Sequence, residues 1–151
     1  MRSMTIRILP VVALVALLGT AVRADGTYGA GVSVQGATKV SDLYASPEKF
    51  VGKTIRVDGV VTSVCTEMGC WVAVKDKVTD QSVRFQAEHD GKIVFPITLK
   101  GKSGSFQGEF VAIAASDMEG HEAAAEHAQS DPKSADFGSR YQIKVTGAVV
   151  Q

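Results

Sequence analysis

Three glycines stand inside long runs of strand-forming residues, and they constrain the fold more than any other feature of the sequence. A glycine within a strand marks a bulge, a sharp bend or a close approach of another backbone. Strands that bend in several places can wrap around a common core and close into a barrel. The glycines and their runs are Gly59 in 54–65, Gly108 in 105–114 and Gly147 in 141–150.

Two shorter strands complete the prediction of a mainly β domain. They are CWVAV at 70–74 and SVRFQA at 82–87. Five bent strands match the OB-fold, a five-stranded Greek-key barrel, in strand number and in length of chain. We therefore predict a small OB-like barrel, and a β-sandwich is the alternative.

Two helices are expected beside these strands. Residues 39–52 have apolar side chains at helical spacing and Pro47 at a second turn, so a short N-terminal helix should precede the first strand. Residues 117–129, DMEGHEAAAEHAQ, are rich in Ala and Glu and contain no β-branched residue. This composition predicts one helix before the last strand.

Residues 1–24 have the three-part layout of a cleavable signal peptide. Arg2 and Arg7 supply the charge, an apolar run follows, and Val22-Arg23-Ala24 places small residues before the expected cut. The apolar run is shorter than the ~20 residues that span a bilayer, so we expect no stable membrane anchor. The protein should be periplasmic or secreted.

The mature chain should hold one domain with a mildly acidic surface. Residues 25–36 are rich in Gly and small polar side chains and predict a flexible leader, and residues 37–151 predict the barrel domain. Removing residues 1–24 takes away 3 of the 16 basic residues and none of the 16 acidic ones, which leaves a net charge near −3. This charge gives no electrostatic reason to expect a nucleic-acid partner.

Five short motifs follow one another along the mature chain. They are Gly52-Lys53-Thr54, the hairpin Val64 to Trp71, Phe95-Pro96, Gly108-Glu109 and the closing strand Tyr141 to Gly147. In these motifs the chain, over about residues 37–150, resembles a bacterial secreted family of unknown function, numbered 4920. The resemblance implies an OB-like fold in the cell envelope and a histidine of interest in the late helix, where His127 stands. It implies no particular activity.

Cys65 and Cys70 flank a four-residue loop between two expected strands. Residues that face each other across antiparallel strands have Cα atoms about 4.5–5.5 Å apart, which suits a disulfide and also suits two thiolates on one metal ion. In an oxidising compartment a structural disulfide is the default interpretation. The sequence alone leaves the disulfide and the metal site open.

The neighbours of the two cysteines favour a soft ion if a metal binds. Met68 adds a thioether, and thiolates with a thioether select Cu(I). Trp71 could cover the ion through a cation–π contact. Met68 as an ordinary loop residue and Trp71 as a packing residue are the simpler interpretations. His127 is a further candidate ligand. His121 and His127 lie six residues apart and would point to different sides of a helix, so they do not form a chelating pair.

The sequence predicts a non-enzymatic binding domain with a metal or protein partner in the cell envelope, and Cu(I) as the candidate ion. It contains no triad order, no phosphate loop and no His-Glu-x-x-His helix, so we expect no enzyme. One alternative is a disulfide-stapled OB-fold that binds a protein or a small ligand. Another is a thiol-redox accessory protein, although the Cys-x4-Cys hairpin differs from the Cys-x-x-Cys of thioredoxin-like proteins.

Overall fold

A computed structural model of the protein describes residues 26–113 and 140–151. The expected signal peptide at 1–24, the expected helix at 117–129 and His127 lie outside these residues. The elements within them are β1 (Gly26–Gly29), α1 (Val40–Ala45), η1 (Pro47–Lys49), β2 (Lys53–Val64), β3 (Trp71–Asp76), β4 (Ser82–Gln86), η2 (Ile97–Leu99), β5 (Ser103–Ala112) and β6 (Tyr141–Val150).

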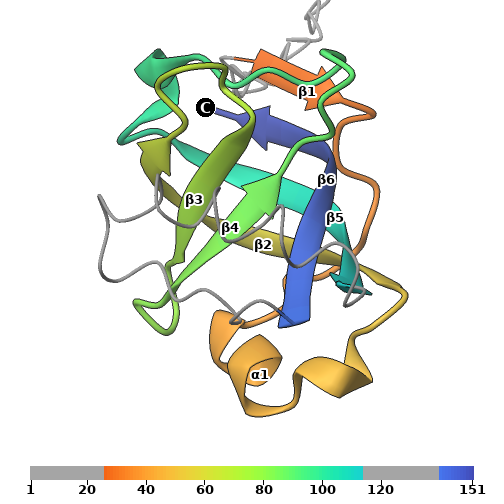
Figure 1. The fold of residues 1–151 in the computed structure, drawn as a ribbon. Helices are drawn as coiled ribbons and strands as arrows, with labels where there is room; N and C mark the ends of the chain where they lie inside the picture. The colour runs from red at the N-terminus through yellow and green to blue at the C-terminus, as the bar shows by residue number, and fades with distance from the viewer. Residues whose placement is uncertain (1–25, 114–139) are drawn as a thin grey trace, which may run out of the picture.

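Strands β2 to β6 close into a barrel. In the order β2–β3–β4–β6–β5 each strand pairs with the next, and β5 pairs back with β2. All of these pairings are antiparallel except that between β4 and β6. Figure 1 shows the strands around one axis, with α1 at one end of the barrel and β1 at the other. The predicted mainly β barrel is confirmed, and its strand order is consistent with an OB-like fold.

The strands bend at glycines and at irregularities in pairing. The register of β5 against β6 shifts between Gln107 and Gly108, which confirms the bend predicted there. Gly59 lies so close to β3 that an added Cβ would overlap the Lys75 carbonyl oxygen. A second shift falls between Val61 and Ser63, and this one controls the position of the cysteine loop, as shown below.

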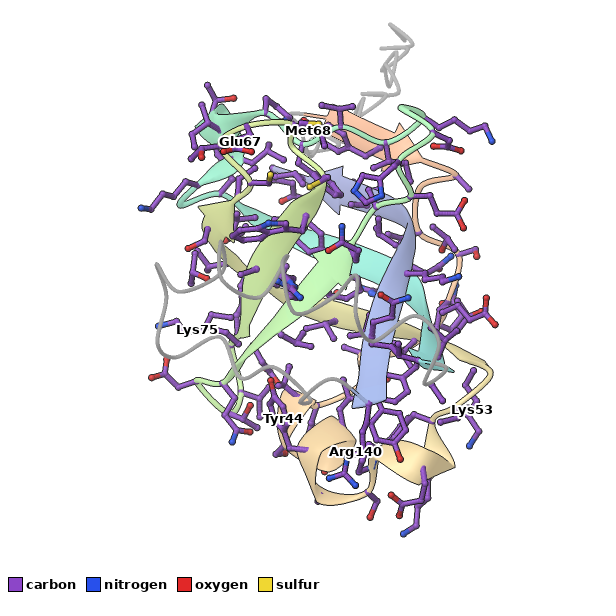
Figure 2. All side chains as sticks on the ribbon, viewed as in Figure 1. Tyr44, Lys53, Glu67, Met68, Lys75 and Arg140 are labelled. Atoms are coloured by element: carbon purple, nitrogen blue, oxygen red, sulfur yellow. The ribbon has the colours of Figure 1, made fainter. Side chains whose placement is uncertain are left out.

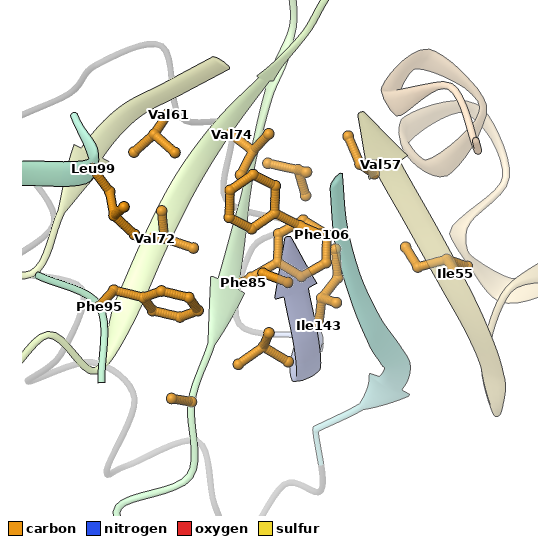
Figure 3. Packing of buried hydrophobic residues seen from close by; sticks show 14 of the residues in the cluster. Ile55, Val57, Val61, Val72, Val74, Phe85, Phe95, Leu99, Phe106 and Ile143 are labelled. Atoms are coloured by element: carbon orange, nitrogen blue, oxygen red, sulfur yellow. The ribbon is translucent and has the colours of Figure 1, made fainter. Parts of the chain in front are cut away.

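The core lies inside the barrel, on the inward face of each strand (Figure 3). The rings of Phe85 and Phe106 are fully buried, and their centroids lie 5.9 Å apart. Val72 and Val74 of β3 and Ile55 and Val57 of β2 are buried with them, as their alternation predicts. Burying each of these side chains contributes about 1.5–3 kcal/mol to folding. The core therefore fixes the strands independently of the loops.

A short helix covers the end of the barrel opposite β1. Val40 and Leu43 of α1 are fully buried, and Asp76 accepts a hydrogen bond from the Val40 N–H at 2.9 Å. Tyr44 donates its hydroxyl to the Ser82 carbonyl at 2.6 Å. Among the described residues no helix has the length and apolar character needed to cross a bilayer.

The described part of the expected leader, residues 26–36, contains a short strand. Residues 26–29 form β1, which pairs antiparallel with Gly147 to Val150 of β6. Beyond β1, the Gln107 side-chain oxygen accepts the Ser33 and Val34 N–H groups, each at 2.8 Å. Backbone hydrogen bonds, which need no apolar side chains, form the pairing of β1 with β6.

Candidate dithiol site

The two cysteines lie at the barrel end that carries β1. They belong to the connection between β2, which ends at Val64, and β3, which begins at Trp71. Figure 2 shows Glu67 and Met68 of this connection at the end opposite Tyr44 and Arg140. Cys65 and Cys70 are both partly exposed, whereas Gly69 between them is buried.

The structure brings the two sulfur atoms together. The Cys70 thiol donates to Cys65 Sγ over an Sγ–Sγ distance of 3.3 Å, with both cysteines in the free form. The predicted proximity of the two cysteines is thus confirmed. Whether they form a disulfide or bind a metal stays a prediction.

The register that the sequence predicts for this hairpin is wrong by one residue. Val61 pairs with Val74, and continuing this register would place Cys65 opposite Cys70. The shift between Val61 and Ser63 adds one residue to β2, so that the Cys65 N–H instead donates to the Trp71 carbonyl at 3.0 Å. Cys70 therefore lies in the loop and not in β3.

Two backbone hydrogen bonds hold the loop in place, one within the loop and one from Phe95. The Gly69 N–H donates to the Cys65 carbonyl at 3.2 Å, and the Gly69 carbonyl accepts the Phe95 N–H at 2.9 Å. Gly69 has φ +62°, and an added Cβ would lie 2.5 Å from the Phe95 carbonyl oxygen. Phe95 is itself buried and its ring packs on Tyr28, with centroids 5.4 Å apart. The hydrogen bond from Phe95 thus connects the loop to a residue of the core.

The last residue of β4 and Ala87, which follows it, hold the backbone of Cys70. The Cys70 carbonyl accepts the Ala87 N–H at 2.7 Å and the Gln86 side-chain amide at 3.1 Å. Sequence reasoning did not single out Gln86. Gln86 can be recognised as a neighbour of Cys70 only once the pairing of β3 with β4 is known. In that pairing Gln86 lies opposite Trp71, the residue that follows Cys70.

The loop stabilises a thiolate at Cys65. Burial alone raises the pKa of this thiol, but hydrogen bonds from the Met68 and Cys70 N–H groups and from the Cys70 thiol outweigh burial. The Glu67 N–H adds a further bond, and the pKa of Cys65 falls to about 7.

The pKa of the Cys70 thiol is raised, whereas that of Cys65 is lowered. Burial raises the pKa of Cys70, and its hydrogen bond to Cys65 and the negative charge that develops there raise it further. The Cys70 N–H and the Gln86 side chain offset this only in part. At neutral pH the pair therefore contains a substantially ionised Cys65 beside a protonated Cys70.

No family model, no curated protein and no solved structure matches the chain. The resemblance to the family numbered 4920 stays a prediction. Inferences about the chemistry of the dithiol site therefore depend on its geometry alone.

The remaining predicted ligands occupy different settings around the two sulfurs. Met68 is 60% exposed, so its thioether is accessible from solvent. Trp71 is half-buried at the start of β3, and the Arg84 guanidinium lies 5.9 Å from the centre of its ring. In this structure Trp71 therefore already stacks with a cation of the protein. His127 lies outside the described residues.

Other metal-binding groups do not cluster in the described part of the chain. No three His, Cys, Asp or Glu side chains within residues 26–113 and 140–151 are placed to hold one ion. His89 is exposed in the turn that follows β4. Within the described residues, Cys65 and Cys70 are the two candidate metal ligands whose contact the structure shows.

Proposed function

We propose that this protein is a non-enzymatic binding domain of the cell envelope that holds one Cu(I) ion between Cys65 and Cys70. The observation that supports the proposal is the 3.3 Å contact between two sulfur atoms on an anchored loop. Thiolates are soft ligands and select Cu(I) over hard cations. Because the loop is held by Phe95, Ala87 and Gln86, little ordering is needed when an ion binds.

The protonation of the pair also favours binding at neutral pH. Thiolates, not thiols, bind metals, and each proton lost on binding opposes affinity. The pKa of Cys65 near 7 means that this ligand is about half ionised at pH 7 before any ion arrives. The Cys70 thiol must lose its proton, so we expect uptake of the ion to release protons and to strengthen as pH rises.

Met68 is the proposed third sulfur ligand. It lies in the loop between the two cysteines, and its side chain is exposed on the same end of the barrel (Figure 2). A thioether adds a neutral soft donor without a further proton to displace. We expect its contribution to affinity to be smaller than that of either cysteine.

Titration of the reduced protein with Cu(I), in competition with a chelator of known affinity and without oxygen, tests the proposal. We expect uptake of one ion per chain, loss of uptake in Cys65→Ser and in Cys70→Ser, and weaker uptake in Met68→Leu. Val78→Ala is the matched control, because Val78 is an exposed apolar residue in the turn at the far end of β3. Absence of uptake by the reduced wild-type protein would exclude the proposal.

A further inference from the structure

We propose that the dithiol end of the barrel docks on a second copy of the chain, and that the two copies share one Cu(I) ion between their dithiol sites. The inference rests on the proposed function, because the ion is part of the contact. Two features support it: an exposed apolar patch beside the loop, and sulfur ligands that remain accessible to another molecule.

Exposed apolar side chains gather beside the dithiol loop. Met68, Val94 and Ile97 are 60%, 51% and 54% exposed, and these three residues form what we call the apolar patch. Val94 lies against the loop, because a Cβ added to Gly69 would come within 2.9 Å of Val94 Cγ1. Ile97 begins η2, shortly after Phe95, whose N–H donates to the Gly69 carbonyl. The patch therefore borders the loop that carries the sulfurs.

Elsewhere in the described part of the chain, the exposed large apolar side chains stand apart from one another. They are Val51, between η1 and β2, and Val78, in the turn between β3 and β4. Single apolar residues on a surface are ordinary, whereas a group of them marks a place where another molecule docks. The apolar patch thus distinguishes the dithiol end from the rest of the described surface.

An ion held by this loop would be accessible to further ligands. Cys65 and Cys70 are both partly exposed, and Met68, the proposed third ligand, is itself a member of the apolar patch. Within residues 26–113 and 140–151 no third His, Cys, Asp or Glu joins the two cysteines in a metal-binding group. Thiolates are the ligands that a soft ion selects, and a second copy brings two more of them beside an identical apolar patch. One copy can thus complete the ligand set of the other.

The apolar patch is too small to hold two copies together without the ion. A stable interface buries about 800 Å² on each partner, from roughly 20 to 30 residues. Three part-exposed side chains fall far short of this, and Glu67, exposed in the same loop, brings like charges together when two copies meet. The same carboxylate disfavours an anionic lipid surface as the occupant of the patch. The reduced protein without metal should therefore be a monomer, and the shared ion should supply the attraction that the apolar contact lacks.

Sharing makes the dimer depend on the ratio of Cu(I) to protein. With one ion for every two chains, each bound ion can recruit the dithiol site of a second copy, so the dimer should be most abundant. With one ion for every chain, each copy holds an ion of its own and the dimer should decline. The ion stays Cu(I) throughout, and the thiols that bind it release their protons to solvent.

Sedimentation velocity of the reduced exported protein, without oxygen and at these two ratios and without metal, tests the inference. We expect monomer without metal, dimer at one ion for two chains, and mostly monomer at one ion for each chain. The double variant Val94→Ser with Ile97→Ser should still take up one ion per chain, but its dimer should be at least about tenfold weaker. Val51→Ser with Val78→Ser is the matched control, because it removes exposed apolar side chains away from the loop.

The outcomes separate this inference from the proposed function. Monomer at every ratio, with Cu(I) uptake intact, would overturn the inference and leave the proposed function standing, whereas absence of uptake would overturn both. A dimer without metal, a dimer undiminished at one ion for each chain, or an equally strong dimer in the patch variant would also overturn the sharing of an ion across this patch. Binding of the metal-free protein to phosphatidylglycerol vesicles through Val94 and Ile97 would assign the patch to a lipid surface instead.

Discussion

A single glycine, Gly69, allows the dithiol loop to pack closely against the backbone of Phe95. Gly69 combines φ +62° with a backbone approach to residue 95 that leaves no room for a Cβ. Gly91 has a similar φ, +73°, but nothing within 4 Å of where its Cβ would be. The two glycines therefore separate the cost of the left-handed backbone from the cost of the close contact.

We predict that Gly69→Ala destabilises the protein more than Gly91→Ala does. An alanine in the left-handed region costs about 1–2 kcal/mol, and this cost applies to both variants. Overlap of the new methyl group with the Phe95 carbonyl should add a further ~1–3 kcal/mol in Gly69→Ala only. Urea denaturation measures both free energies of unfolding. Equal losses would show that residue 95 does not constrain the loop.

At the scale of elements, Asp76 joins the end of β3 to α1. Its carboxylate accepts the Val40 N–H of α1 at 2.9 Å, the Val78 N–H at 2.6 Å and the Thr79 hydroxyl at 3.1 Å. Burial raises the pKa of Asp76, but the Val40 and Val78 N–H groups outweigh burial and lower it. Asp58, by contrast, forms a part-exposed ion pair with Arg56.

We predict that Asp76→Ala costs about 3 kcal/mol of stability near pH 7, whereas the control Asp58→Ala costs about 1 kcal/mol or less. A lowered folded-state pKa contributes stability that is present above the unfolded-state pKa of about 3.9 and is lost as pH falls through the folded-state value. The difference between the wild-type protein and Asp76→Ala should therefore shrink in acid. Thermal unfolding across pH 2 to 7 measures it, and a constant difference would contradict this role.

The sequence predicts β2 and β6 well because both strands are long and most of their inward-facing apolar positions alternate. It misplaces the cysteine loop because the irregularity in β2 lies at Val61 to Ser63, where no glycine marks it. The apolar spacing contains the signal: Ile55, Val57 and Val61 share one parity, but Val64, not Ser63, is the next buried residue. That spacing of three assigns the inward position to Val64 and excludes Cys65 from the core face.

The dithiol site is harder to predict than the strands, because contacts between segments far apart in the sequence form it. The sequence places two cysteines at the ends of one hairpin loop, and this part of the prediction holds. It cannot show that Phe95 and Gln86 approach the loop, because these contacts follow from barrel closure. The lowering of the Cys65 pKa comes largely from backbone N–H groups, which every residue but proline has, so no side-chain pattern reports it.

At the scale of the whole molecule, the dithiol site lies in a loop at one end of the barrel, whereas most of the core lies inside the barrel. Phe106 is fully buried and packs against Phe85 inside the barrel. The cysteines are part-exposed in a loop outside the paired strands. The barrel should therefore tolerate changes in the redox state of the loop.

We predict that oxidation of Cys65 and Cys70 raises the free energy of unfolding by about 2 kcal/mol or less, since the disulfide closes a short loop. Phe106→Ala should lower it by about 3–5 kcal/mol in either redox state, because it leaves a cavity in the core. Chemical denaturation of the wild-type protein and the variant, each oxidised and reduced, gives the four values. If the site and the core are independent, the two effects should add within about 0.5 kcal/mol. A coupling above about 1 kcal/mol, or unfolding of the wild-type protein on reduction, would show instead that the disulfide is part of what holds the barrel together.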